Sequence, residues 1–568
     1  MKVPLRSLVI AATIALLVAP TTALTRMFQG LNYDPFSSSW EGCKTVSQIA
    51  TEFEAIAKVT DRLRIQSMRC TARILDAAAD AGLKVWIGLW TEEDEIKPWS
   101  TFDIEFTTLK ELVESNTVRN DNVLGVQIGN DALHRCYIQG QNAMSLYRDI
   151  VDRVNKVRTY LRSKGLLIPV TAADTIDSYI RFPGLYSIVD VVSVNYFPIW
   201  EKVAAADGMN LLFPRWQGIV KQALAAGKPV LLSETGWSTA DDKYLVAEAS
   251  PAAQALYIKD FLSLAERQSI NYYYYSAIDM STYGNLVEQS FGIFDVNLNL
   301  KSSIQDIAPG PQLIVTRIFN GDNVLKVDPH NWNALLVEEP ASGLRQNFVD
   351  ELWIYEPNSQ MYYSKSSNLC LDAYPAGSGN DLLHMFYCGT SNVNQKWQFT
   401  DEGHLKSLNG ADQCINIDRT QKNKLGMERC NDDASQKFSM RELRAEPVTI
   451  TAGEFYLYEW YDDVLSTTDT TCADCKLWFY DPIAQQLKSK SGDKCLDAYL
   501  DGNNMIVHVY DCDATNANQK WQFNEVTGQW IHGTRLGLCL DGPNSGKVHL
   551  AFCDKSKASQ QWTMAFAQ

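Results

Sequence analysis

The sequence has few of the features that a nucleic-acid-binding or membrane protein needs. Its 51 lysine and arginine residues are outnumbered by 67 aspartates and glutamates, which gives a formal net charge of −16. A phosphate backbone requires clustered Lys and Arg, so we expect no nucleic-acid partner. Beyond the opening segment the chain has no apolar run of membrane-spanning length, so we expect no membrane partner either.

Motifs for metals and nucleotides are also missing. The 7 histidines form no HExxH pattern, and Cys472 and Cys475 lack the second cysteine pair of a zinc ribbon. No glycine-rich phosphate loop follows the first predicted strand. We therefore expect no metal and no cofactor. The acidic composition suits a neutral partner such as a polysaccharide.

The opening segment MKVPLRSLVIAATIALLVAPTTALT carries two basic residues, then an apolar run, then small residues. This order is typical of a secretory signal peptide, which we expect to span residues 1–23. The mature protein would then be secreted, either extracellular or in a cell wall, where disulfides can form. The cysteines number 13, so at least one has no partner within the chain.

Residues 24–309 alternate short apolar runs with longer stretches of helical pattern. The runs are MFQGLNY, RLRIQS, KVWIGLW, NVLGVQIGN, LLIPVTAA, VDVVSVNY, KPVLLSE and INYYYYSA. Continuous apolar strands separated by helices predict a parallel sheet covered by helices, and eight units match a (β/α)8 TIM barrel. A doubly wound open sheet is the alternative, which the missing phosphate loop disfavours.

From about residue 310 the pattern changes to short strands, turn residues and an internal repeat. Two near-duplicate copies begin with CLDAY at Cys370 and Cys495 and end with NQKWQF, and weaker copies begin at Cys414 and Cys539. Units of about forty residues, each with a cysteine pair and a terminal Gln-x-aromatic motif, resemble the ricin B-type β-trefoil lectins. The resemblance implies two all-β trefoil domains, at residues 310–445 and 446–568.

Two carboxylates follow strands that would lie on opposite sides of the barrel mouth. Asp131 comes directly after the fourth run, and Glu234 ends the seventh. Reactive groups of such barrels lie at the C-terminal ends of strands, and glycoside hydrolysis needs a proton donor paired with a nucleophile or a base. For either residue alone, a solvated loop acid is the alternative interpretation.

The runs GLNYDP, GND, VNYFPIW, SETGWST and NLVEQSFGIFD resemble glycoside hydrolase family 17, which contains endo-β-1,3-glucanases and glucan transglycosylases. The resemblance implies a retaining enzyme in which Glu234 of SETGW is the nucleophile. Asp131 holds the acid/base position, which in the family is normally the glutamate of a GNE motif. The shorter side chain withdraws the carboxyl by about 1.5 Å, at a site where an error of about 1 Å can cost about a hundredfold in rate.

The same resemblance implies substrate contacts around this pair. Asn130 is expected to bond the sugar 2-hydroxyl, and Glu288 of NLVEQSFG matches a further acid of the cleft. Tyr33, Tyr196 and Trp237 follow strands one, six and seven, where they would supply aromatic platforms for pyranose rings. Core packing is the alternative for each aromatic residue, and a surface salt bridge is the alternative for Glu288.

The ricin B resemblance implies one working sugar pocket in each trefoil. In such a pocket an Asp accepts from two hydroxyls, an aromatic ring packs on sugar C–H groups, and His and Asn fix the orientation. The expected residues are Asp372, His384, Phe386 and Asn394 in the first trefoil, and Asp497, His508, Tyr510 and Asn518 in the second. The weaker copies have Asn416 in place of the Asp, or Ala551 in place of the ring, so we expect no pocket there.

The cysteines of the repeats are 14 to 18 residues apart and are expected to close loops as disulfides. A short-loop bridge is expected within CADC, and a further bridge between two adjacent barrel loops. The expected pairs are Cys370 with Cys388, Cys414 with Cys430, Cys495 with Cys512, Cys539 with Cys553, Cys472 with Cys475 and Cys43 with Cys70, leaving Cys136 free.

The expected protein is a secreted, monomeric, retaining glycoside hydrolase that acts on β-1,3-glucan as an endo-glucanase or a glucan transglycosylase. Its lectin modules would hold it on β-glucan or another cell-wall polysaccharide through their own glycan ligands. A β-1,6-linked substrate stays open. The alternative is a weakly active or inactive multivalent carbohydrate-binding protein, which the replacement of glutamate by Asp131 favours.

Overall fold

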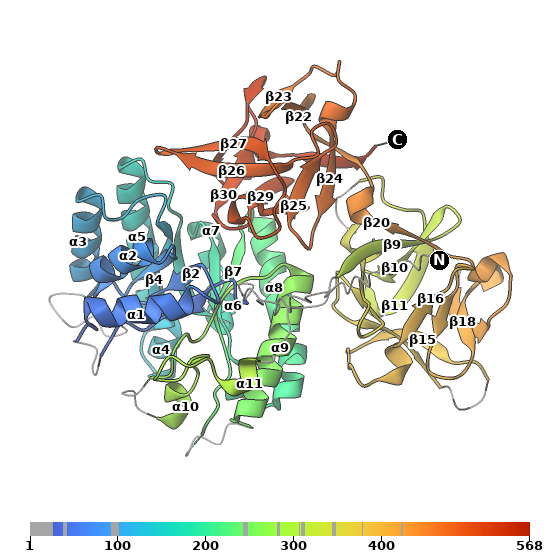
Figure 1. Cartoon of the computed structure of the whole chain (residues 1–568), viewed down its shortest axis with the longest axis horizontal. Helices are drawn as coiled ribbons and strands as arrows, with labels where there is room; N and C mark the ends of the chain where they lie inside the picture. The colour runs from blue at the N-terminus through green and yellow to red at the C-terminus, as the bar shows by residue number, and fades with distance from the viewer. Residues whose placement is uncertain are drawn as a thin grey trace, which may run out of the picture.

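The computed structural model describes residues 27–37, 42–92, 101–241, 248–280, 285–305, 307, 313–343, 348–375, 377, 379–421 and 424–567. The predicted signal peptide lies outside these residues. Figure 1 shows three bodies along the chain: an α/β body coloured blue to green, a β body coloured yellow to orange, and a β body coloured orange to red. We call the second and third bodies the first and second β modules.

Eight parallel strands close into a barrel in chain order, which confirms the (β/α)8 prediction. The strands are β1 (Leu31–Asn32), β2 (Arg62–Arg64), β3 (Lys84–Leu89), β4 (Val123–Asn130), β5 (Val170–Thr175), β6 (Val192–Asn195), β7 (Val230–Thr235) and β8 (Asn271–Tyr274). The helices are α1 (Val46–Ile56), α2 (Thr71–Asp80), α3 (Thr101–Glu114), α4 (Ala132–Ile138), α5 (Ala143–Ser163), α6 (Ile176–Arg181), α7 (Leu185–Ile188), α8 (Gly208–Ala226), α9 (Pro251–Gln268), α10 (Leu286–Gln289) and α11 (Ser302–Gln305).

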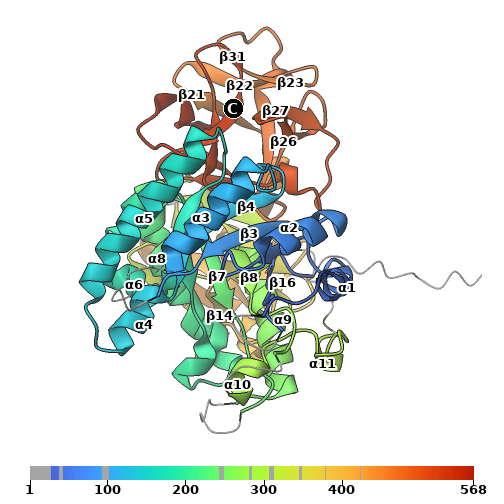
Figure 2. The same ribbon diagram turned by 90° about the vertical axis from the view of Figure 1, so that its left-hand side faces the viewer.

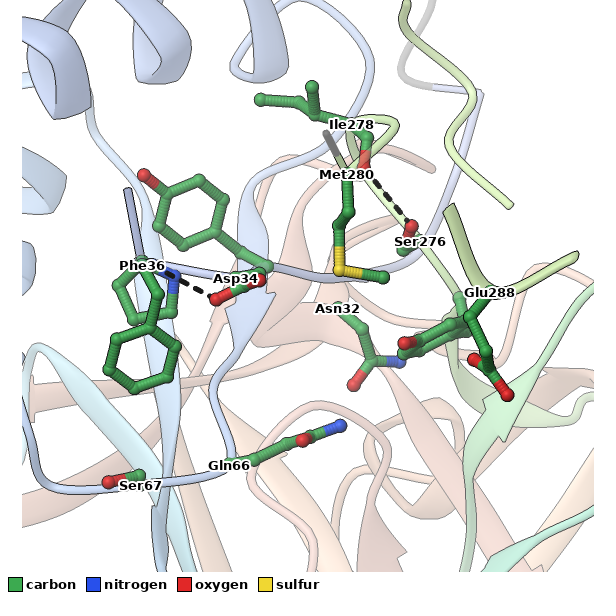
Figure 3. Close-up of a pocket in the computed structure, with 12 residues that line it drawn as sticks. Asn32, Asp34, Phe36, Gln66, Ser67, Ser276, Ile278, Met280 and Glu288 are labelled. Atoms are coloured by element: carbon green, nitrogen blue, oxygen red, sulfur yellow. Dashed lines mark hydrogen bonds between the residues drawn. The ribbon is translucent and has the colours of Figure 1, made fainter. Parts of the chain in front are cut away.

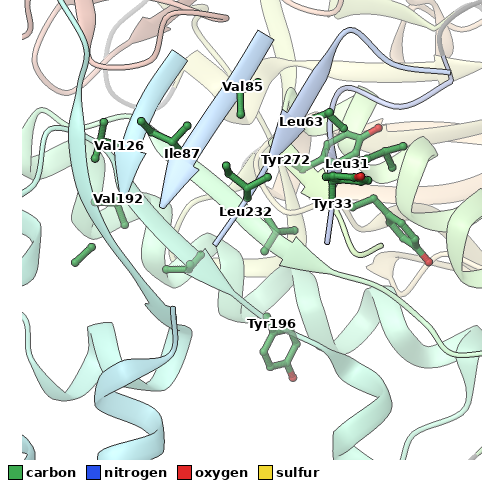
Figure 4. Close-up of a cluster of buried hydrophobic side chains, with 14 of the residues drawn as sticks. Leu31, Tyr33, Leu63, Val85, Ile87, Val126, Val192, Tyr196, Leu232 and Tyr272 are labelled. Carbon is green, nitrogen blue, oxygen red and sulfur yellow. The ribbon is translucent and has the colours of Figure 1, made fainter. Parts of the chain in front are cut away.

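The sequence pattern explains these elements. All residues of β4 and β7 are buried, as expected for strands inside a parallel barrel. Helix α5 buries one stripe at helical spacing, made of Leu146, Ile150, Val154, Val157 and Leu161. Figure 4 shows part of the resulting core, in which Leu31, Leu63, Val85, Ile87, Val126, Val192 and Leu232 lie between the strands and the helices around them.

The rest of the chain folds as antiparallel β-sheet, as the trefoil prediction requires. The first module contains β9 (Ile314–Asn320), β10 (Asn323–Asp328), β11 (Asn331–Glu338), β12 (Trp353–Glu356), β13 (Met361–Ser364), β14 (Cys370–Tyr374), β15 (Leu382–Phe386), β16 (Trp397–Phe399), β17 (Leu405–Ser407), β18 (Gln413–Asp418), β19 (Lys424–Arg429) and β20 (Ser439–Glu442). Strand β20 pairs with β9, so the module closes on its own first strand. Its indole-bearing core includes Trp353 and Trp397.

The second module has the same plan. It contains β21 (Val448–Ala452), β22 (Phe455–Trp460), β23 (Asp463–Thr467), β24 (Leu477–Asp481), β25 (Gln486–Ser489), β26 (Cys495–Asp501), β27 (Asn504–Tyr510), β28 (Trp521–Asn524), β29 (Gln529–His532), β30 (Leu538–Asp541), β31 (Gly546–Lys547), β32 (His549–Phe552) and β33 (Thr563–Phe566). Strand β33 pairs with β21, which again closes the module. Trp521 and Trp562, which end the two Gln-x-Trp motifs of this module, are fully buried and therefore belong to its core, as does Trp478.

The second module is docked on the barrel at the end opposite to the C-terminal ends of the strands (Figures 1 and 2). Leu536, only 3% exposed, is buried in one cluster with Trp86, Leu124, Val191, Leu231 and Tyr273 of the barrel. Gly537 adopts a φ of +84° beside it, and a Cβ there would lie 3.1 Å from the Cβ of Pro169. Arg535 donates to the carbonyl of Asn120, just before β4, at 2.6 Å. This module therefore closes the bottom of the barrel.

The structure contains all six expected disulfides, and buried Cys136 belongs to none of them. Four of them join the two ends of a loop within a repeat of a β module, and Cys43–Cys70 joins loops that follow β1 and β2. Among the residues described here, no helix combines the length and apolar character needed to cross a membrane.

Candidate active site and sugar pockets

The two expected catalytic carboxylates lie at the C-terminal ends of β4 and β7. Glu234 is the fifth residue of β7 and is 3% exposed, and half-buried Asp131 directly follows β4. Asn195, which ends β6 and pairs in register with Glu234, donates its amide Nδ2 to Asp131 Oδ1 at 3.0 Å. The barrel therefore brings into one site two carboxylates that are about a hundred residues apart in sequence.

Asp131 stands at the N-cap position of α4, but its side chain does not cap the helix. Its backbone is left-handed, with φ 54° and ψ 28°, and it makes no side-chain cap bond. Asp174 of β5 takes that role, because its carboxylate accepts from the backbone N–H groups of Leu133 at 2.7 Å and His134 at 3.2 Å. The Asp131 carboxylate is thus left for another task, which argues against a structural loop acid.

The surroundings of Asp131 make it a better proton donor than an ordinary aspartate. Burial raises its pKa well above the usual value, and the negative charges of Glu234 and Asp174 raise the pKa further. The guanidinium of Arg135 and the bond from Asn195 act in the opposite direction and are the smaller influences. A carboxyl that keeps its proton toward neutral pH can serve as a general acid.

Arg64 of β2, fully buried, is the centre of the polar network and was missed by the sequence reasoning. Its Nη1 donates to Glu234 Oε1 at 2.6 Å and its Nη2 donates to Asn130 Oδ1 at 2.7 Å. Gln66 adds a bond to the same Glu234 oxygen at 2.8 Å. These bonds fix the Glu234 side chain and place positive charge beside it. The sequence did contain a signal for this role, because Arg64 is a charged residue inside a strand that was predicted to be buried.

The same network orients Asn130. Its Oδ1 accepts from Arg64 and also from Asn195 Nδ2, at 3.1 Å. Since the oxygen is engaged on the protein side, the amide hydrogens of Asn130 are turned toward the site. A hydrogen-bond donor beside Glu234 suits the 2-hydroxyl contact that the family resemblance implied.

A cavity of about 220 Å³ opens next to this network (Figure 3). Asn32, Gln66 and Glu288 bring polar groups to it from β1, the loop after β2 and α10, whereas Phe36, Ile278 and Met280 form an apolar side. Burial and the charge of Glu234 raise the pKa of Glu288. Apolar walls with a few convergent polar groups are typical of a small-molecule site.

The three expected aromatic platforms are buried. Tyr33 lines the cavity but is 4% exposed, and its hydroxyl donates to Glu52 at 2.5 Å. Tyr196 is 6% exposed, and Trp237 has no exposed surface and donates its indole N–H to the carbonyl of Glu248 at 2.7 Å. Trp237 therefore lies in the core cluster of the barrel, as the packing alternative held. Trp200, in the segment after β6, is 40% exposed, so its ring is accessible.

In the first β module, three of the residues expected to bind sugar lie on or at the end of β14 and β15. Asp372, almost buried, pairs with His384 across the two strands, and His384 Nε2 lies 3.2 Å from Asp372 Oδ1. The ring of Phe386, 50% exposed, lies 5.4 Å from the His384 ring. The asparagine that bonds Asp372 is Asn392, at 3.0 Å, whereas Asn394 donates its backbone N–H to Asn392.

The second module repeats this geometry on β26 and β27. His508 Nε2 lies 3.3 Å from Asp497 Oδ1, and the ring of Tyr510, 57% exposed, lies 5.8 Å from the His508 ring. Asn516 bonds Asp497 at 3.0 Å and accepts the backbone N–H of Asn518. Asn392 and Asn516 share the pattern N-x-N-Q-K-W, which was the signal that the sequence reasoning overlooked.

The two weaker repeats have lost this arrangement. In one of them Asn416 is bonded by Ser435 at 2.7 Å, so no carboxylate is available. In the other, Asp541 is 2% exposed and is occupied by Lys557 at 2.5 Å and Gln560 at 3.1 Å. The Asp541 carboxylate therefore already has a cationic partner on Oδ2, and Ala551 supplies no ring to pack on a sugar face.

Comparison with known families finds the same two kinds of domain. Residues 30–292 match the BtgE/BtgC glycoside hydrolase domain. Residues 361–446 and 465–562 match the ricin-type beta-trefoil lectin domain. The family 17 and ricin B resemblances seen in the sequence are therefore confirmed.

Two individual relatives each match about two fifths of this chain. Cell surface mannoprotein MP65 of Candida albicans is 26% identical over 236 residues, which are 41% of this chain and 58% of that protein. Probable family 17 glucosidase SCW10 of Saccharomyces cerevisiae is 25% identical over 237 residues, 41% of this chain and 56% of that protein. The chain thus spans less than two thirds of the length of each. A solved active-site mutant of Rhizomucor miehei beta-1,3-glucanosyltransferase in complex with laminaritriose is 28% identical, with 50% of this chain and 98% of that chain covered and a TM-score of 0.43.

Proposed function

We propose that this chain, in which a BtgE/BtgC-type glycoside hydrolase domain precedes ricin-type lectin modules, is a retaining glycosidase of β-1,3-glucan. The observation that carries the proposal is the pair formed by Asp131, with its raised pKa, and Glu234, held by Arg64. One carboxyl is set to give a proton, and the other presents a fixed negative charge. A glycosidase needs these two functions on the two sides of the scissile bond.

In the proposed reaction, Asp131 donates its proton to the glycosidic oxygen while Glu234 attacks the anomeric carbon. The C1–O bond breaks, the leaving sugar departs as an alcohol, and a glycosyl ester forms on Glu234. Asp131, now a carboxylate, takes a proton from the incoming water or sugar hydroxyl, which attacks C1 and releases Glu234. Water gives hydrolysis and a sugar hydroxyl gives transglycosylation. Asn130 bonds the 2-hydroxyl and strengthens that bond in the transition state.

The substrate and location are proposed from the relatives. Their names describe a cell surface mannoprotein and a family 17 glucosidase, which supports a secreted protein that meets β-glucan in a cell wall. The chain is proposed to work as a monomer. The two sugar pockets would hold it on the wall, because linking weak sites to one enzyme raises its effective concentration there.

Asp131→Asn is expected to abolish reducing-sugar release from laminarin while sparing the first step on an aryl glucoside whose leaving group needs little protonation. Thin-layer or reducing-end assays on both substrates measure this. Asp131→Glu, which restores the missing methylene, should raise the rate on laminarin. Wild-type protein that releases no sugar from laminarin would instead support the non-catalytic carbohydrate-binding alternative.

The same Asp131→Asn change should stabilise the fold at neutral pH. Because the folded-state pKa of Asp131 lies above the unfolded value of about 3.9, the wild-type fold loses stability as the pH rises from that value through the folded pKa. The amide carries no such penalty. We therefore expect a higher Tm for Asp131→Asn than for wild type at pH 7, with the difference vanishing near pH 3.5. An equal difference at both pH values would contradict the raised pKa.

The sugar pockets are tested by retention on insoluble cell-wall glycan. Asp372→Ala should weaken retention in part, and adding Asp497→Ala should weaken it far more, since the second loss removes the remaining attachment. The rate on soluble laminarin should stay unchanged in both variants, because neither residue lies near the cleft. Asp541→Ala is the matched control, since Lys557 already occupies that carboxylate. Equal loss in the control would show a structural effect.

A further inference from the structure

A row of side chains crosses four strands of the second module and includes its proposed sugar pocket. Trp460 of β22 pairs in register with Asp463 of β23. Asp463 pairs with His508 of β27, which pairs with Asp497 of β26. Residues directly opposite each other in antiparallel strands place their side chains on the same face of the sheet. Trp460 therefore shares a face with two members of the pocket.

This face is turned outward. The alternate residues of the same strands, including Leu457, Val464, Val507 and Leu496, are buried in the module's core. Trp460 is 45% exposed, and Tyr510, also on the outer face, is 57% exposed. Figure 1 shows β22, β23, β26 and β27 together in the upper module.

The spacing of the row separates Trp460 from the pocket by more than one sugar ring. Neighbouring strands lie about 4.8 Å apart, so the backbone of Trp460 is about 10 Å from that of His508 and about 14 Å from that of Asp497. A single pyranose bound at Asp497 does not reach the Trp460 ring. A chain of linked pyranoses does.

The surroundings of Trp460 are those of a binding surface. Tyr461, 81% exposed, packs edge-on against Trp460 at 5.3 Å. Between Trp460 and His508, the carboxylate of Asp463 is paired with Lys547 at 2.7 Å, and both groups can meet hydroxyls. An exposed aromatic patch rimmed by polar groups and continuous with a pocket marks an interaction site. The hairpin belongs to the repeat that has no sugar-binding Asp of its own.

We propose that Trp460 forms a second subsite beside the Asp497 pocket, so that the second module binds a neutral oligosaccharide rather than a single sugar. The inference rests on the proposed sugar-binding function of Asp497. One terminal residue occupies the pocket, with Tyr510 against its apolar face, and the chain crosses Asp463 to stack on Trp460. Chain length, and not only the terminal sugar, then sets the affinity of this module.

The test uses the full chain carrying Asp372→Ala, which silences the first module, and Glu234→Gln, which prevents turnover of the probes. The probes are glucose with laminaritriose and galactose with β-1,4-galactotriose, measured by titration calorimetry. Adding Asp497→Ala to this background removes the pocket of the second module, so any binding that remains occurs elsewhere in the molecule. In the series that the pocket recognises, the trisaccharide should bind about tenfold more tightly than the monosaccharide, equivalent to about 1.4 kcal/mol.

Trp460→Ala should remove that gain and leave monosaccharide affinity unchanged, while Trp460→Phe should keep most of it. Trp332→Ala is the matched control, since Trp332 is a tryptophan of the first module with a similar exposure of 46%. If the trisaccharide still binds more tightly than the monosaccharide after Trp460→Ala, or if it never does, the subsite is wrong. The Asp497 pocket is unaffected by either result. If Asp497→Ala changes binding in neither series, the pocket itself fails, and the inference falls with it.

Discussion

Glu234→Gln is expected to lower kcat on laminarin by about ten-thousandfold or more, because the amide keeps the shape of the side chain and loses the attacking charge. Substrate binding should persist, since Asn130, Gln66 and the cavity walls are unchanged. The measurements are reducing-sugar release for turnover and calorimetric titration with laminaritriose for binding. Loss of binding together with turnover would indicate a disturbed site and not a missing nucleophile.

The matched control for this prediction is Glu201→Gln. Glu201 is a glutamate on the loop after β6 whose side chain is 42% exposed and lies 3.9 Å from Arg215. An exposed ion pair of this length contributes little, so the variant should keep wild-type turnover and Tm. Turnover of Glu234→Gln within a few fold of the control would remove Glu234 from the mechanism.

Deleting residues 446–568 is expected to destroy activity on soluble laminarin as well as attachment to the wall. The second module closes the bottom of the barrel, so its removal uncovers Trp86, Leu124, Val191, Leu231 and Tyr273. It also breaks bonds to the barrel, such as Gln522 Nε2 to the Ser269 carbonyl at 2.9 Å and Lys555 to the Ala225 carbonyl at 2.9 Å. The barrel should therefore aggregate or melt at a lower temperature. If the deletion leaves the Tm and the activity on soluble laminarin unchanged, the second module serves only to attach the enzyme to the wall.

A single substitution tests the same contact in the full chain. Leu536→Ala should cost about 3 kcal/mol, within the range for emptying a buried leucine site, and should lower the Tm of the barrel. Val526→Ala, at a position of the same module that is 44% exposed, should leave the Tm unchanged. Scanning calorimetry compares the two. Equal melting of both variants would show that Leu536 does not support the barrel.

The sequence alone placed Asp131 and Glu234 at strand ends, because short local patterns mark those positions. Each carboxylate directly follows an apolar run, and strand ends meet at one mouth in a barrel of parallel strands. Arg64 and Asn195 were not predicted, although they contact Glu234, Asn130 and Asp131. Their bonds join strands that are tens of residues apart. The alternation pattern of a strand predicts which face a side chain lies on, but it does not predict which residues that side chain contacts across the barrel.

The aromatic residues show the same limit. Tyr33, Tyr196 and Trp237 were placed correctly at strand ends, yet their burial depended on how the following loops fold over them. In the lectin repeats, spacing identified Asp372 and Asp497, but the asparagines that bond these carboxylates lie two positions before the expected ones. A turn decides which of two neighbouring amides points inward, and both satisfy the sequence motif.

The sequence by itself determined the barrel, the repeats, the disulfide pairs and the positions of Asp131 and Glu234, because periodicity, cysteine spacing and strand ends are properties of short segments. Only the tertiary structure decided that Asp131 is half-buried near Asp174 and Glu234, that Arg64 pairs with Glu234, and that Leu536 packs against the barrel. Burial and the charges around a carboxyl set its pKa, and both depend on which distant segments the fold brings together.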